Sequence, residues 1–98
     1  MKIKNTSIAG TLESSDIYIV LAPSDKNIIE LTLKSSVGKQ YGKQIRKVIL
    51  DTLRKSGVNS AVVNATDKGA LDCVIKARVE TVILRASNEN HFCWEDEK

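Results

Sequence analysis

The feature that most constrains the fold of this chain is a run of six apolar residues, Ile17-Tyr18-Ile19-Val20-Leu21-Ala22. Most of them are β-branched or aromatic, which favours a β-strand. Because neighbouring side chains of a strand point to opposite faces, this run is apolar on both faces. It therefore predicts a central strand that is covered, at least in part, on both sides.

Three further segments are typical of strands. Residues 7–12 form a short candidate, residues 29–34 alternate between apolar and polar, and residues 61–66 form another short candidate. The segment 23–27 contains Pro23 and has the composition of a turn. The short distance along the chain between 17–22 and 29–34 predicts an antiparallel hairpin of these two strands.

Two segments have apolar residues at helical spacing. The first begins after Ser35 and Ser36, which can cap a helix, and it stops at Gly57. The second covers about residues 70–87 and has one apolar face, with Asp67 available as its N-cap. The order strand, strand, strand, helix, strand, helix predicts an α+β two-layer sandwich, in which two helices pack on one face of a small antiparallel-rich sheet.

Length and composition indicate a single domain. The 98 residues leave no room for a second core, so we expect one domain over residues 1–87 and a flexible acidic tail over residues 88–98. No apolar run approaches the length of a membrane span, and the N-terminus lacks the apolar stretch of a signal peptide. We therefore expect a cytoplasmic protein without a membrane partner. One histidine and two scattered cysteines do not make a metal site.

The charge is distributed unevenly along the chain. Residues 1–88 hold 14 basic and 8 acidic residues, whereas residues 89–98 hold 1 basic and 4 acidic residues. One face of the first expected helix is especially basic, with Lys39, Lys43, Arg46, Lys47 and Arg54. This face could simply be solvated, or it could contact an acidic partner or the phosphates of a cofactor, and charge alone does not distinguish these.

The polar break Glu13-Ser14-Ser15-Asp16 separates two strand candidates. It is readily explained as a turn, because Ser and Asp side chains hydrogen-bond nearby backbone groups. It could also present an exposed hydroxyl for attachment of a group by a separate enzyme. The segment contains no base and lacks the glycines of a nucleophile elbow, so hydrolytic catalysis is not expected. Phosphate-binding loops and metal-ligand spacings are absent from the sequence too.

Four motifs carry a resemblance to a known family. They are Ala9-Gly10-Thr11-Leu12-Glu13-Ser14-Ser15-Asp16, Gly42-Lys43-Gln44-Ile45-Arg46, Asp67-Lys68-Gly69-Ala70-Leu71-Asp72-Cys73-Val74-Ile75 and Ala77-Arg78-Val79-Glu80. With these motifs the chain resembles the acyl carrier (gamma) subunit of citrate lyase over roughly residues 1–87. The tail after Ser87 lies outside the resemblance.

The resemblance implies that Ser14 carries a covalent prosthetic group, 2'-(5''-phosphoribosyl)-3'-dephospho-coenzyme A, attached by a prosthetic-group transferase. The thiol of this group would carry acetyl and citryl thioesters between the alpha (transferase) and beta (lyase) subunits of citrate lyase, which cleave citrate to acetate and oxaloacetate. The chain would then not be catalytic alone. Its contribution would be a tether that raises the effective concentration of substrate at two active sites.

Two other functions remain open from the sequence. The carrier subunit of malonate decarboxylase uses a similar arm. A small RNA-binding module is suggested by the basic helix and the mixed fold. However, Tyr18 is the only aromatic residue that the expected strands offer for stacking, and there is no recognisable RNA motif, so no nucleic-acid partner is expected.

Overall fold

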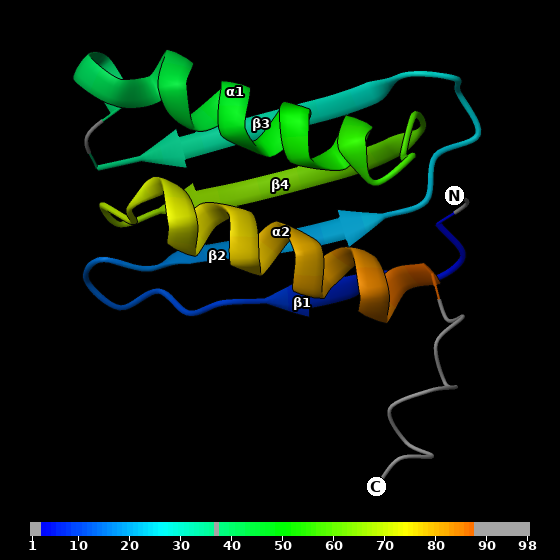
Figure 1. Ribbon diagram of the computed structural model, residues 1–98, viewed down its shortest axis with the longest axis horizontal. Helices are drawn as coiled ribbons and strands as arrows, with labels where there is room; N and C mark the ends of the chain where they lie inside the picture. Colours follow the sequence, from blue (N-terminus) through cyan, green and yellow to red (C-terminus); the bar gives the residue numbers. More distant parts are fainter. Residues whose placement is uncertain (1–2, 37, 88–98) are drawn as a thin grey trace, which may run out of the picture.

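The computed structural model describes residues 3–36 and 38–87, without the side chain of Lys39. Both helices lie on the same face of a four-stranded sheet (Figure 1). This confirms the expected α+β two-layer arrangement, while the tail expected at residues 88–98 lies outside the described residues. The elements are β1 (Ser7–Ala9), β2 (Ile17–Ala22), β3 (Ile29–Ser35), α1 (Gly38–Lys55), β4 (Ala61–Asp67) and α2 (Asp72–Ser87).

The strand order is β1-β2-β4-β3, so the predicted hairpin of β2 and β3 was wrong. β4 lies between them, antiparallel to β2 and parallel to β3. The reason is the reach of the connection at residues 23–28. Strands two places apart are separated by about 10 Å, and a six-residue segment can span up to about 20 Å when extended. The connection therefore leaves room for a third strand.

The interior position of β2 is confirmed, but its two faces differ. Ile17, Ile19 and Leu21 are fully buried under the helices, whereas Tyr18, Val20 and Ala22 on the other face are half-buried. Among the described residues, no helix covers that second face. We expected cover on both faces of β2. On this second face the cover comes only from the side chains of the neighbouring strands.

The core lies between the sheet and the two helices. It is built from Ile, Leu, Val and Ala, and no aromatic side chain of the described residues belongs to it. Burying one such Ile or Leu side chain contributes about 1.5–3 kcal/mol. The largest fully buried apolar side chains are Ile17, Ile19, Leu21, Ile49, Leu53, Val58, Val63, Ile75, Val79, Val82 and Ile83.

The first helix ends as the sequence predicts. Gly57 has φ +86, and its amide donates a hydrogen bond to the Arg54 carbonyl at 3.0 Å. The next amide, of Val58, donates to the Leu53 carbonyl at 2.9 Å. This pair of bonds is the Schellman motif, which satisfies the last carbonyls of a helix and turns the chain away.

The second helix begins at Asp72, slightly later than the sequence predicts. The carbonyl of Leu71 accepts the first hydrogen bonds of the helix. The buried Asp67 carboxylate instead accepts bonds from the amides of Gly69 and Ala70, both at 3.0 Å. It therefore shapes the connection between β4 and α2 rather than capping the helix itself.

The first strand, β1, ends at Ala9 and not at residue 12 as expected, because Gly10 turns the chain. Gly10 has φ +90, a conformation that favours glycine. A Cβ atom at this position would lie 1.7 Å from the carbonyl oxygen of Ile17. The backbones on either side of the loop thus approach more closely than any side chain would allow.

We expect Gly10→Ala to lower the free energy of unfolding by about 3 kcal/mol, since the clash adds to about 1–2 kcal/mol of backbone strain. Gly69→Ala is the matched control. Gly69 has φ +92, but nothing lies within 4 Å of an added Cβ, so only the strain of about 1–2 kcal/mol is expected. Urea unfolding followed by circular dichroism measures both. Equal losses would show that the close approach at Gly10 is unimportant.

Candidate functional site

The segment between β1 and β2, residues 10–16, is named here the serine loop. It lies at the same end of the molecule as the start of α2 (Figure 1). Two backbone hydrogen bonds join it to the connection between β4 and α2. The Ser15 amide donates to the Lys68 carbonyl at 2.8 Å, and the Lys68 amide donates to the Asp16 carbonyl at 2.9 Å. The loop is therefore held against a neighbour that is distant in sequence.

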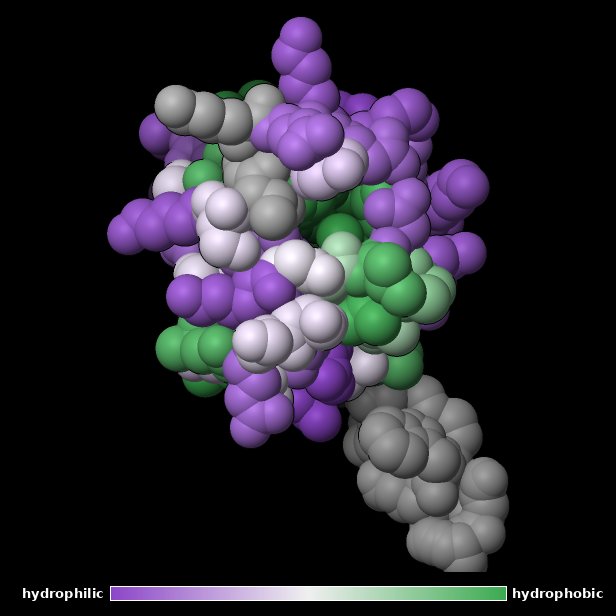
Figure 2. All heavy atoms as spheres, turned by 90° about the vertical axis from the view of Figure 1, so that its left-hand side faces the viewer, coloured by the Kyte–Doolittle hydropathy of each residue, from purple (hydrophilic) through white to green (hydrophobic). Residues whose placement is uncertain are grey.

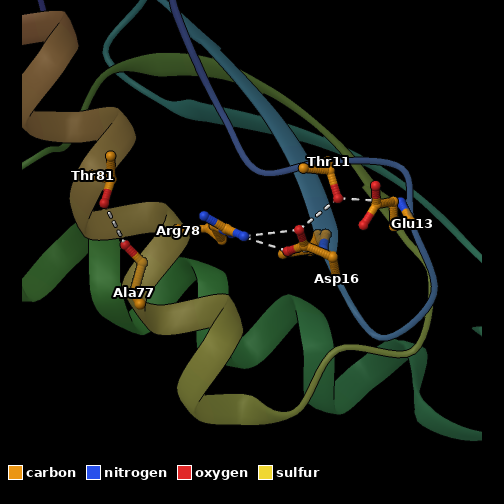
Figure 3. A network of polar contacts seen from close by, with 7 residues as sticks. Thr11, Glu13, Asp16, Ala77, Arg78 and Thr81 are labelled. Atoms are coloured by element: carbon orange, nitrogen blue, oxygen red, sulfur yellow. Dashed lines mark hydrogen bonds and ion pairs between the residues drawn. The ribbon is translucent and has the colours of Figure 1, made fainter.

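Asp16 is the anchor of the serine loop (Figure 3). Arg78 of α2 donates two hydrogen bonds to its carboxylate, from Nε to Oδ1 at 3.0 Å and from Nη2 to Oδ2 at 2.8 Å. Thr11 Oγ1 donates to Oδ2 at 2.6 Å, and the Ile17 amide donates to Oδ1 at 2.7 Å. A bidentate pair of this kind is strong and fixes geometry as well as energy.

These hydrogen bonds also set the protonation state of the pair. The Arg78 guanidinium, followed by the Thr11 hydroxyl, holds the pKa of Asp16 far below its usual range, although burial acts in the opposite direction. The hydrogen bond from Arg78 to Asp16 in turn raises the pKa of the guanidinium. Asp16 is thus an ionised structural carboxylate and cannot serve as a base near neutral pH.

The side chain of Ser14 takes no part in holding the loop, and the same is true of Ser15, which is held by its backbone amide alone. Ser14 is exposed, and its hydroxyl makes no hydrogen bond within the part of the chain that the structure describes. The turn is closed around it, since the Asp16 amide donates to the Glu13 carbonyl at 3.2 Å and Ser15 adopts φ +66. The loop therefore presents the Ser14 hydroxyl to solvent on a fixed backbone.

The role of Arg78 was not predicted from the sequence. Its signal was present: Arg78 stands midway between Val74 and Val82, at a spacing of four residues from each, on or beside the apolar stripe of α2. When this face of the helix packs on a sheet, the partly buried guanidinium favours a carboxylate as its partner. The sequence did not reveal which of the carboxylates would supply it.

The basic face of α1 is mostly solvated in the structure. Lys47 pairs with Asp51 at 2.8 Å across one helical turn, and both side chains are largely exposed. The hydrogen bond between them raises the pKa of Lys47 and lowers the pKa of Asp51. Such exposed pairs contribute little to stability. The side chains of Lys43, Arg46 and Arg54 on this face are exposed as well.

Residues 3–36 and 38–87 contain neither a cluster of metal ligands nor a membrane-spanning helix. No group of three or more His, Cys, Asp or Glu side chains there could hold a metal ion. None of the helices in those ranges has the length and apolar character needed to cross a membrane.

Comparison with known proteins relates this geometry to a family. The family model described as malonate decarboxylase delta subunit (MdcD) matches residues 4–86. The citrate lyase acyl carrier protein of Clostridium perfringens is 52% identical over 94 residues, covering 96% of this chain and 93% of the relative. That of Streptococcus mutans is 53% identical over 96 residues, covering 98% and 94%. That of Lactobacillus helveticus is 59% identical over 87 residues, covering 89% of each chain.

Solved structures support the same fold. A chain in the crystal structure of a Pseudomonas malonate decarboxylase hetero-tetramer in complex with malonate superposes with a TM-score of 0.75. The match covers 88% of each chain at 16% sequence identity, which shows a shared fold and no more.

The fold, the exposed serine loop and the names of the relatives together define an acyl carrier protein, a class of non-catalytic carrier subunits. More specifically, the chain belongs to the family of citrate lyase acyl carrier proteins. This confirms the resemblance seen in the sequence motifs and the expectation that the chain is not an enzyme alone. The attachment role of Ser14 remains a prediction.

Asp16→Asn tests the anchor of the loop. We expect it to lower the free energy of unfolding at pH 7 by about 2 kcal/mol, the scale of hydrogen bonds to a charged group. The pKa of Asp16 is lower in the folded chain than in the unfolded one, so its stabilisation is present above about pH 4–5 and is lost as pH falls further. Urea midpoints between pH 7 and 3 should therefore fall less steeply in the variant.

Asp51→Asn is the control for this measurement. Its pair with Lys47 is exposed, so we expect a smaller loss of stability that added salt removes. If Asp16→Asn costs no more than Asp51→Asn, then Asp16 does not anchor the loop.

Proposed function

We propose that this chain is the acyl carrier (gamma) subunit of citrate lyase and that Ser14 carries phosphoribosyl-dephospho-coenzyme A through a phosphodiester bond. The observation that carries the proposal is the state of Ser14, an exposed hydroxyl without a partner in the described chain, on a loop that Asp16 anchors to Arg78. The residues present fit the group, because nothing must be displaced to join a phosphate to this oxygen. When bound, the group would supply a thiol that carries acyl thioesters.

The residues of the chain itself have a positioning role. Asp16, Arg78 and Thr11 hold the serine loop in one shape, so a modifying enzyme meets the Ser14 hydroxyl in a defined place. Asp16 is not placed to activate that hydroxyl, since its carboxylate bonds to Arg78 and Thr11 and its lowered pKa makes it a weak base. The base for the attachment reaction must therefore come from a separate prosthetic-group transferase.

We assign the alpha and beta subunits of citrate lyase as partners, in the cytoplasm, where citrate is cleaved to acetate and oxaloacetate. The support is the 52–59% identity to citrate lyase acyl carrier proteins over almost the whole chain. The tethered group would stay at high effective concentration near both active sites. The exposed cations of α1 are the surface that suits acidic faces on these partners.

A second candidate is the carrier subunit of malonate decarboxylase, which the family model and the Pseudomonas structure favour. The identity to that structure is only 16%. Reconstitution of activity with each set of partner subunits separates the two candidates. Activity only with the malonate decarboxylase subunits would replace the first proposal by the second.

The attachment site is tested by intact mass and peptide mapping of protein produced together with the other subunits and the transferase. We expect a coenzyme-A-like adduct on the wild-type chain, none on Ser14→Ala, and full modification of Ser15→Ala. Ser15→Gly is a further control, since glycine suits φ +66 at this position. An adduct retained in Ser14→Ala would move the site, and an unmodified wild-type chain would refute the assignment.

A further inference from the structure

A groove of about 340 Å³ lies between α1 and the segment that leads from β4 into α2. It is named here the interhelix groove, and its walls are mainly apolar. Figure 2 looks at this end of the molecule and shows apolar side chains gathered on the side of the helices, next to polar ones. The groove is lined by Tyr41, Ile45, Gly69, Ala70, Leu71 and Asp72.

The position of the groove relative to Ser14 is set by hydrogen bonds already described. Ser15 and Asp16 both bond to the backbone of Lys68, which directly precedes the groove residues Gly69 and Ala70. The attachment loop and the wall of the groove are therefore parts of one hydrogen-bonded unit. A group joined to Ser14 would begin next to the groove.

The chemistry of the groove suits an arm that alternates between methylene and amide groups. Leu71 is 69% exposed and Tyr41 is 50% exposed, so two large side chains are left unpacked at its mouth. At the rim, Gln44 Nε2 donates to Asp72 Oδ2 at 2.9 Å, which places amide and carboxylate groups beside the apolar wall. The exposed Lys68 adds a cation on the side of Ser14, where an arm would carry its phosphates.

We propose that the interhelix groove is a resting site for the pantetheine part of the arm on Ser14. This rests on the proposed attachment of the arm. The groove is open, and its affinity for a free ligand of this kind need only be weak. A short flexible tether supplies an effective concentration in the millimolar range, so a dissociation constant of about 1 mM already fills the groove roughly half of the time. The arm would then be shielded between visits to partner subunits.

The first test uses nuclear Overhauser effects in the holo protein, after intact mass has shown that the arm is present. We expect contacts between the geminal methyl groups of the pantetheine and the side chains of Leu71 and Tyr41. Ile28 is the matched control: it is 53% exposed but precedes the first residue of β3, at the opposite end of β4 from the groove. No contacts to the arm are expected there.

The second test measures how fast the arm thiol reacts with iodoacetamide, in a Cys73→Ser, Cys93→Ser background so that only this thiol is alkylated. We expect Leu71→Ser to speed the reaction roughly two- to fourfold, the change that follows from emptying a groove filled half to three quarters of the time. Ile28→Ser should leave the rate unchanged. Thermal unfolding confirms that both variants fold, as substitution of exposed side chains should allow.

The outcomes separate this proposal from the one on which it rests. A modified chain with no contacts from the arm to Leu71 or Tyr41, and with equal alkylation rates in the two variants, would overturn the resting site and leave the attachment intact. A chain of unmodified mass would overturn both. Contacts to Ile28 as strong as those to Leu71 would show an arm without a preferred site.

Discussion

The ion pair of Asp16 and Arg78 is the interaction on which the functional end of this molecule depends. It ties a loop between two strands to the helix that covers them. Taking the Asp16 carboxylate out of water is costly, whereas the Arg78 side chain stays 39% exposed. The cost is offset because both carboxylate oxygens accept hydrogen bonds, from Arg78, from Thr11 and from the Ile17 amide. The loop is thereby joined by side-chain hydrogen bonds to a helix that is distant in sequence.

In this arrangement, the residues that hold the serine loop in place are different from the residue whose hydroxyl faces solvent. Asp16, Thr11 and the backbone of Ser15 hold the loop, while Ser14 is left with an exposed hydroxyl. A carrier has to offer one attachment point to several enzymes in a reproducible place, and it needs no catalytic group of its own for that purpose. The connection through Lys68 also joins the same loop to the segment that lines the groove between the helices, so Ser14 and the groove wall are positioned by one set of contacts.

Much of the fold followed from local patterns. The apolar run at 17–22 predicted an interior strand, the helical spacing predicted both helices, and Gly57 predicted the end of the first one. The errors concern pairing and ends. The turn at 23–27 suggested a hairpin, yet β4 lies between the two strands, because a connection of that length reaches past one neighbour. The early end of β1 follows from a close backbone approach at Gly10 that composition does not reveal.

The residue pattern alone was sufficient for the types of the elements, the apolar face of the second helix, and the presence of a serine-rich turn with acidic flanks, because these depend on neighbours within a few positions. Only the folded chain decided the strand order, the meeting of Asp16 with an arginine 62 residues away, and the approach of Gln44 to Asp72 across 28 residues. Such contacts depend on how whole elements pack together, and packing selects among many arrangements that local preferences permit equally well.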